Sequence, residues 1–157
     1  MTNKLLQLYD IVKHTNVGVD IMQKLTRLPD TELEVMKAIW QKGTGICTSE
    51  IKQILDKQRI WNISALQTLL NRLIKRGFLT TYKNGKNKYY NIVVDEKTYL
   101  AFENKCFLKK VNENSVTKLV ASLYQSNSIT KNDLKELAEF IEKNTEGDDH
   151  DNTSKSI

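Results

Sequence analysis

The sequence has few cysteines and no long apolar run, and these absences argue against a disulfide-rich secreted protein and against a membrane-spanning one. Its two cysteines, Cys47 and Cys106, are far apart in the chain, which favours reduced thiols in a cytoplasm over a disulfide framework. No apolar stretch approaches the roughly 20 residues that a membrane-spanning helix needs, and the first residues lack the apolar core of a secretory signal. We therefore expect a soluble, cytoplasmic protein without membrane insertion.

Catalytic and metal-binding patterns are also missing from the sequence. It contains no Ser/His/Asp grouping, no phosphate-binding glycine loop and no cluster of metal ligands at a recognisable spacing. The two histidines, His14 and His150, are isolated from any obvious partner. We therefore predict that the protein is not an enzyme and needs neither a metal nor another cofactor.

Acidic residues are absent between Asp56 and Asp95, whereas the whole chain contains 19 of them. A positive block confined to one structural unit is the footprint expected for contact with a phosphate backbone. The alternative is an ordinary solvated basic face. The block consists of Lys57, Arg59, Arg72, Lys75, Arg76, Lys83, Lys86 and Lys88.

The centre of this block predicts an amphipathic helix between Asn62 and Gly77. Leucines at positions 66, 69, 70 and 73 have the spacing of one buried helical face, while Asn62 suits an N-cap and Gly77 a left-handed C-terminal residue. The opposite face is polar and free of acid, which suits hydrogen bonding to base edges in the DNA major groove. Asn71 is equally compatible with a contact within the helix surface. The candidate base-reading residues are Ser64, Ala65, Gln67, Thr68 and Asn71, and the candidate phosphate contacts on the helix are Arg72, Lys75 and Arg76.

The flanking sequence predicts a winged helix-turn-helix DNA-binding domain over residues 28–94. One helix follows Pro29 and ends near Gly43, a short edge strand covers residues 44–46, and a second helix opens at Thr48 or Ser49. After the predicted helix of residues 62–77, strand-like runs at residues 78–82 and 88–94 flank an Asn-Gly hairpin turn. This order of elements is typical of a winged helix. The predicted phosphate contacts of the wing are Lys83, Lys86 and Lys88.

Residues 95–143 return to helical spacing and predict three amphipathic helices, so the fold class is mainly α with a small β hairpin. Their apolar faces are too extensive to bury one another, and we expect a second copy of the chain to cover them. The alternative is a bundle packed only on its own winged helix. The predicted dimerisation residues are Phe102, Phe107, Val111, Leu119, Val120, Leu123, Leu137, Phe140 and Ile141.

The two ends of the chain carry less information. Residues 1–27 form an N-terminal extension with helical potential, and Met22 is an alternative start of translation. Residues 144–157 are polar, acidic and without aromatics, which predicts a disordered tail.

Several segments, in the same order along the chain, resemble the penicillinase-repressor family of the BlaI, MecI and CopY type. The resemblance covers about residues 28–143. The segments that carry it are residues 33–40, 61, 68–73, 75–79, 89–90, 107–111 and 119–122. The resemblance implies a homodimeric winged-helix repressor on an inverted-repeat operator, released by proteolysis or by a metal signal. The chain lacks the C-terminal cysteine cluster of the copper-responsive branch, which disfavours copper sensing. The BlaI/MecI branch is thus the better match, and it implies a β-lactam response, a role in antibiotic resistance and a membrane sensor protease as partner.

Two departures from the family pattern affect its sites. Repressors of the proteolytic branch are cut between an asparagine and a phenylalanine, whereas the aligned bond here is Cys106–Phe107, the candidate cleavage site. Family members often carry threonine and a basic residue where this chain has Ala65 and Gln67, so we expect an operator related but not identical to TACA/TGTA half-sites. Two alternatives stay open: a family repressor that answers a metal or other signal, and a winged-helix protein-interaction adaptor.

Overall fold

The computed structural model of the chain describes residues 25–145. The predictions for Met22, for most of the N-terminal extension and for the tail beyond residue 145 lie outside the described residues. The chain divides into two compact units, of which the first ends at Lys105 and the second begins at Cys106. This division lies later in the chain than the predicted junction between residues 94 and 95. The assignment of DNA binding to residues 28–94 and of dimerisation to residues 95–143 stays a prediction.

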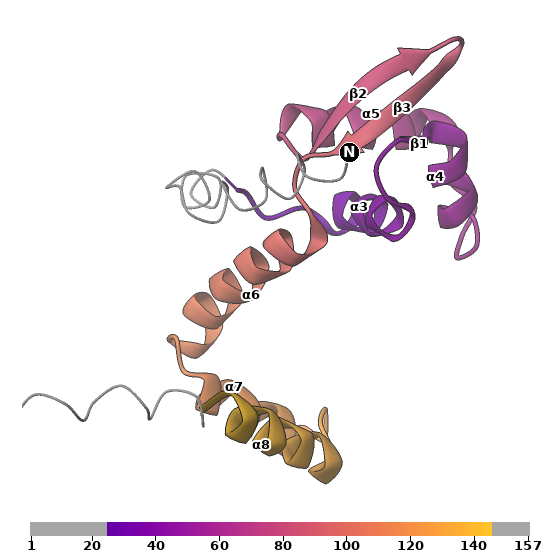
Figure 1. Cartoon of the computed structure of the whole chain (residues 1–157). Coiled ribbons are helices and arrows are strands. Elements are labelled where there is room, and N and C mark those ends of the chain that lie inside the picture. Colours follow the sequence, from indigo (N-terminus) through magenta and orange to yellow (C-terminus); the bar gives the residue numbers. More distant parts are fainter. Residues whose placement is uncertain (1–24, 146–157) are drawn as a thin grey trace, which may run out of the picture. The chain divides into compact units, whose positions relative to one another are not determined.

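The first unit is a winged helix, which confirms the predicted fold class (Figure 1). Its helices and strands follow the predicted order along the chain. They are α3 (Asp30–Lys42), β1 (Ile46–Cys47), α4 (Thr48–Leu55), α5 (Ile63–Lys75), β2 (Leu79–Asn84), β3 (Asn87–Ile92) and the start of α6 (Glu96–Asn112).

Helix α5 begins and ends where its local sequence signals predict. The side-chain oxygen of Asn62 accepts hydrogen bonds from the backbone N–H groups two and three residues later, at 2.8 and 3.2 Å. At the other end, Gly77 has a φ of +81°, and the N–H of Phe78 donates to the carbonyl of Leu73 at 2.9 Å. These contacts satisfy backbone groups that a helix end leaves without partners. The two signals therefore determine the length of α5.

The core of the first unit lies between the helices and the inner face of the sheet. Three of the four predicted leucines of α5, Leu66, Leu70 and Leu73, are completely buried, and Leu69 packs partly against the core. Complete burial of a leucine side chain stabilises a fold by about 1.5–3 kcal/mol. The buried leucines thus fix which face of α5 points outward. The core residues that other elements contribute include Val35, Met36, Ile39, Ile46, Ile51, Trp61, Phe78, Leu79 and Tyr90.

The sheet is antiparallel and has the strand order β1–β3–β2. Strands β2 and β3 pair from Leu79 opposite Ile92 to Asn84 opposite Asn87, so the hairpin loop is only two residues long. Of these two, Gly85 has a positive φ of +61°, as a type II′ turn requires at its first central position. Both strands therefore reach further toward the tip than the sequence predicts, and Lys86 lies at the tip itself.

The start of α6 packs into the first unit through Tyr99, which is completely buried. The Tyr99 ring lies edge-on to Phe78 and tilted against Trp40, with centroid distances of 5.6 and 5.7 Å. Phe102, a predicted dimerisation residue, is partly buried against the same core, 6.2 Å from the Tyr99 ring. The apolar face predicted for α6 is therefore divided, because its first part completes the winged helix.

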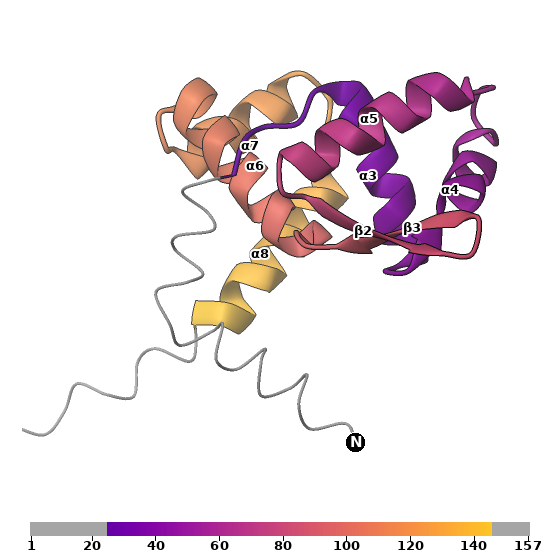
Figure 2. The ribbon, with the colours of Figure 1, turned by 90° about the horizontal axis from the view of Figure 1, so that it is seen from above.

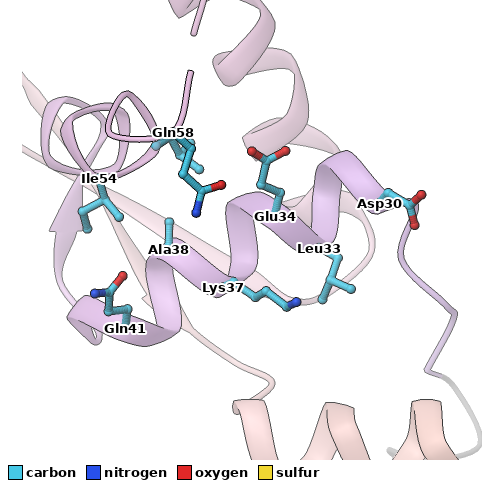
Figure 3. A pocket seen from close by; sticks show the side chains of 9 residues that line it. Asp30, Leu33, Glu34, Lys37, Ala38, Gln41, Ile54 and Gln58 are labelled. Atoms are coloured by element: carbon cyan, nitrogen blue, oxygen red, sulfur yellow. The ribbon is translucent and has the colours of Figure 1, made fainter. Parts of the chain in front are cut away.

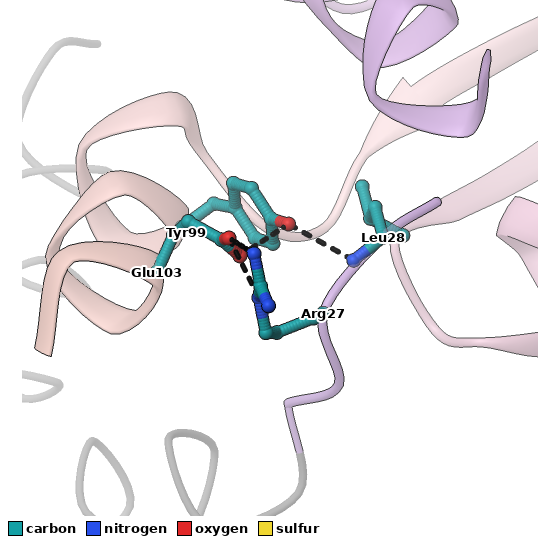
Figure 4. Close-up of polar contacts among 4 residues, drawn as sticks. All are labelled: Arg27, Leu28, Tyr99 and Glu103. Atoms are coloured by element: carbon teal, nitrogen blue, oxygen red, sulfur yellow. Dashed lines mark hydrogen bonds and ion pairs between the residues drawn. The ribbon is translucent and has the colours of Figure 1, made fainter. Parts of the chain in front are cut away.

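Polar contacts join the start of α6 to the segment before α3 (Figure 4). The hydroxyl of Tyr99 accepts a hydrogen bond from the N–H of Leu28 and donates one to Glu103, both at 2.9 Å. The Arg27 guanidinium pairs with the Glu103 carboxylate, with Nε 2.7 Å from Oε1. Burial raises the pKa of the Tyr99 hydroxyl, and the hydrogen bond from Arg27 lowers the pKa of Glu103. These contacts tie α6 to the winged helix at a point that local sequence patterns do not show.

The second unit contains the end of α6, α7 (Val116–Gln125) and α8 (Lys131–Thr145), in agreement with the predicted helices. Ser115 caps α7 by accepting the N–H of Lys118 at 3.1 Å. Thr130 caps α8 through reciprocal hydrogen bonds with Asp133. The two short links between the helices are therefore defined by local capping.

Candidate nucleic-acid interface

The outward face of α5 carries all five predicted base-reading residues. Each of them is exposed, on the side opposite the buried leucines. The hydroxyl of Thr68 donates a hydrogen bond to the carbonyl of Ser64 at 3.0 Å, so it has acceptor capacity left for an outside donor. Gln67 is exposed and can both donate and accept, as bidentate contact with adenine requires. This face can therefore distinguish base pairs by hydrogen bonding.

The wing, which is the hairpin of β2 and β3, lies next to α5 (Figures 1 and 2). Lys83 and Lys88 are direct cross-strand partners. Because side chains alternate along a strand, both lie on the sheet face that carries Leu79 and Tyr90, which is the face packed on the helices. The Lys88 ammonium is 5.7 Å from the centroid of the Tyr90 ring. The hairpin therefore extends a cationic surface from the helical side of the sheet.

The basic residues in the last turn of α5 differ in their surroundings. Arg72, Lys75 and Arg76 are all exposed. The Nε of Arg76 also lies 2.9 Å from the carboxylate of Glu32, which is only 1% exposed. All four line a cleft of about 480 Å³ between the start of α3 and the end of α5. The three cations predicted to contact phosphate are thus close together, but one of them already has an anionic partner inside the protein.

The loop before α5 adds an exposed apolar residue that the sequence analysis did not single out. Ile60 is 91% exposed, while the neighbouring Trp61 is buried in the core. The guanidinium of Arg59 lies 4.3 Å above the Trp61 ring and 2.8 Å from the carboxylate of Glu34. This loop and the predicted DNA-contacting residues Ala65, Thr68 and Arg72 line one cleft of about 520 Å³. The sequence offered only one signal for this loop, an isoleucine beside Arg59 within the acid-free run.

Another groove, of about 420 Å³, lies between α3 and α4 (Figure 3). Acidic Glu34 and basic Lys37 line it together with apolar Leu33 and Ile54. None of its lining residues comes from α5 or the wing. It is therefore separate from the candidate interface.

The structure places the predicted dimerisation residues at different depths. In the second unit, Phe107, Val111, Phe140 and Ile141 are between 42% and 63% exposed, and Leu137 is also exposed. Leu119, Val120 and Leu123 are partly buried. The candidate cleavage bond, Cys106–Phe107, lies inside α6, where Cys106 is partly buried and carries a free thiol.

Two other features concern the class of site. Within residues 25–145, no group of three or more histidine, cysteine, aspartate or glutamate side chains is arranged to hold a metal ion. In the same part of the chain, no helix combines the length and the apolar character that crossing a membrane requires.

Comparisons with known proteins identify relatives along most of the chain. The profile of the penicillinase repressor family matches residues 28–143. The penicillinase repressor of Bacillus licheniformis is 32% identical over 122 residues, which cover 78% of this chain and 94% of the relative. The methicillin resistance regulatory protein MecI of Mammaliicoccus sciuri is 28% identical over 120 residues, which cover 76% and 97%. A solved structure of monomeric Bacillus licheniformis BlaI in complex with the blaP half-operator is 42% identical, with a TM-score of 0.40, and the match covers 47% of this chain and 89% of that chain.

Proposed function

The chain belongs to the penicillinase repressor family of DNA-binding transcriptional repressors and is not an enzyme; on that premise we propose that it binds an inverted-repeat operator as a homodimer. The observation that carries this proposal is the exposed, acid-free face of α5 beside the lysines of the wing. Helix α5 lies in the major groove, and the wing contacts the phosphate backbone.

The base-reading side chains of α5 set the operator preference. Gln67 suits adenine, Thr68 offers an acceptor or a methyl group, and Ala65 contacts only a thymine methyl. The operator therefore differs from the family's TACA/TGTA half-sites at the base pairs that these side chains contact. Arg72, Lys75 and the wing lysines add affinity that does not depend on sequence and falls steeply with salt.

The exposed apolar residues of the second unit support pairing with another copy of the chain. Phe107 and Val111 on α6 and Phe140 and Ile141 on α8 are exposed, and large apolar side chains left exposed in this number favour an interaction site. A dimer places two recognition helices on two half-sites, so that binding at the first raises the effective concentration at the second. Occupancy of a promoter by such a dimer is the repression mechanism.

Proteolysis in α6 is the proposed route of release. The bond between Cys106 and Phe107 lies inside a helix, so a protease reaches it only after local unfolding. A cut there leaves Tyr99 and Glu103 with the winged helix and removes the second unit. The fragment then loses the second half-site and most of its avidity. The protease is a membrane sensor that responds to β-lactams, and the repressor acts in the cytoplasm.

Direct binding to DNA tests the proposal. The purified chain is mixed at low salt with a random-sequence duplex and separated on a native gel, and the retained DNA is amplified and sequenced. We expect a retarded complex and enrichment of an inverted repeat. A complete absence of binding at low salt would contradict the repressor and favour the protein-interaction adaptor. Mapping the fragment produced by a sensor protease tests the cleavage site, which a cut at another bond would exclude.

A further inference from the structure

Arg76 at the end of α5 is engaged by a carboxylate from inside the protein. The Glu32 side chain is 2% exposed and that of Arg76 is 35% exposed, and Nε lies 2.9 Å from Oε2. The donor N–H is not aligned with that oxygen, so the contact is an ion pair and not a directed hydrogen bond. Arg76 also donates from Nη1 to the hydroxyl of Thr26 at 3.3 Å. The guanidinium is therefore held from two sides.

Burial makes this ion pair difficult to break. A carboxylate removed from water is stable only when a cation or hydrogen-bond donors compensate its charge. Among the described residues, Arg76 is the cation that pairs with Glu32. If the guanidinium turned outward to neutralise a phosphate, it would leave a buried charge without a partner. The free energy of that loss opposes a DNA contact by Arg76.

The position of Arg76 in α5 gives the ion pair a second consequence. Arg76 is the C-cap residue of the recognition helix, and Glu32 lies in the first turn of α3. The pair therefore joins the end of the helix that reads DNA to a helix of the core.

We propose that Glu32 is a positioning residue of the DNA interface. It fixes Arg76 in an ion pair, so that Arg76 does not contact a DNA phosphate. Arg72 and Lys75, which are exposed on the same turn, then supply the phosphate contacts at this end of α5. This inference rests on the proposed binding of α5 to DNA. It corrects the simpler expectation that every basic residue of the acid-free run faces the phosphate backbone.

The salt dependence of DNA binding tests the proposal, because it counts phosphate contacts. Each contact contributes about 0.9 to the slope of log affinity against log salt concentration. We would measure this slope with a random-sequence duplex for the full chain and for three single variants. Lys75→Gln should lower the magnitude of the slope by about 0.9 per bound protomer. Arg76→Gln should leave it unchanged, and Glu32→Gln should raise it by about 0.9, because the released guanidinium becomes free to reach a phosphate.

The double variant Glu32→Gln/Arg76→Gln is the control for folding, since it removes both charges and leaves no buried charge unpaired. Circular dichroism verifies that each variant is folded. A wild-type slope in the double variant supports the structural role of Arg76, even if Arg76→Gln alone does not fold. A slope lowered by about 0.9 in either Arg76 variant would overturn it. No binding by the wild-type chain would instead contradict the proposed function itself.

Discussion

Lys83 and Lys88 lie directly opposite each other on the two strands of the wing. Like charges in this arrangement destabilise a sheet by roughly 0.2–1 kcal/mol. The proposed function explains why both are present, because a phosphate backbone placed against the hairpin would neutralise them.

The substitution Lys83→Thr separates the effect of this lysine on stability from its effect on DNA binding. The substitution should raise the free energy of unfolding by roughly 0.2–1 kcal/mol, since it removes the repulsion and introduces a residue that favours strands. It should also lower the salt dependence of DNA binding by about one phosphate contact. Urea denaturation and fluorescence anisotropy with labelled duplex measure the two quantities. Lys37→Gln, in the groove between α3 and α4, is the control that should leave DNA binding unchanged.

Gln67→Ala should alter specificity at one base pair. Loss of a bidentate contact to a base costs about 1–3 kcal/mol in discrimination, so the variant should bind the selected operator more weakly and tolerate substitutions at that position. Competition with single-base operator variants measures the change. Lys75→Gln is the matched control, because it should weaken all operator variants alike. Equal weakening of all variants by Gln67→Ala would show that Gln67 does not read a base.

Tyr99→Phe should destabilise the first unit while its core packing is retained. The hydroxyl accepts the buried N–H of Leu28, and a buried donor left unsatisfied costs about 1–3 kcal/mol. Chemical denaturation of the full chain should show this loss. Tyr124→Phe, at a tyrosine that is 41% exposed on α7, is the control and should have a smaller effect. Equal stability of Tyr99→Phe and the wild type would show that the hydroxyl contacts contribute nothing.

The ion pair of Glu103 with Arg27 should make the folded chain less stable in acid. The hydrogen bond from Arg27 lowers its pKa in the folded chain below the ordinary value of 4.5. The ionised carboxylate therefore contributes stability that is fully present above pH 4.5 and is lost as the pH falls through the lowered folded value. Glu103→Gln should be less stable at neutral pH and should show a smaller decrease in acid. A pH series of urea denaturation curves compares the two proteins, and parallel curves would contradict the contribution of Glu103.

Phe140→Lys should weaken the homodimer. Phe140 is 63% exposed on α8, and a lysine in an apolar interface must either be buried without a partner or keep the two copies apart. Sedimentation should show a shift toward the monomer, with a loss of affinity for the full operator but not for a half-site. Glu139→Lys, on the neighbouring exposed position, is the control. A dimer of unchanged stability in Phe140→Lys would exclude α8 from the interface at this position.

Local patterns were sufficient for much of the DNA-binding unit. Asn62 and Gly77 indicate the ends of α5 because capping depends on atoms within a few residues along the chain. The leucine spacing indicates the buried face for a similar reason, since helix geometry alone puts those side chains on one side. The outward positions of Gln67 and Thr68 follow directly.

Contacts between distant segments were decided only by the tertiary structure. Glu32 and Arg76 both look like surface charges in the sequence, yet packing of α3 against the end of α5 buries one and engages the other. Tyr99 lies in a segment whose spacing predicts an amphipathic helix, and only the fold shows that it fills the core of the winged helix. The physical reason is that burial depends on which helices meet, and helical periodicity specifies a face without specifying its partner. The sequence alone thus determined the ends and the buried face of α5, and the folded chain decided that Arg76, among the cations of its last turn, is paired with buried Glu32.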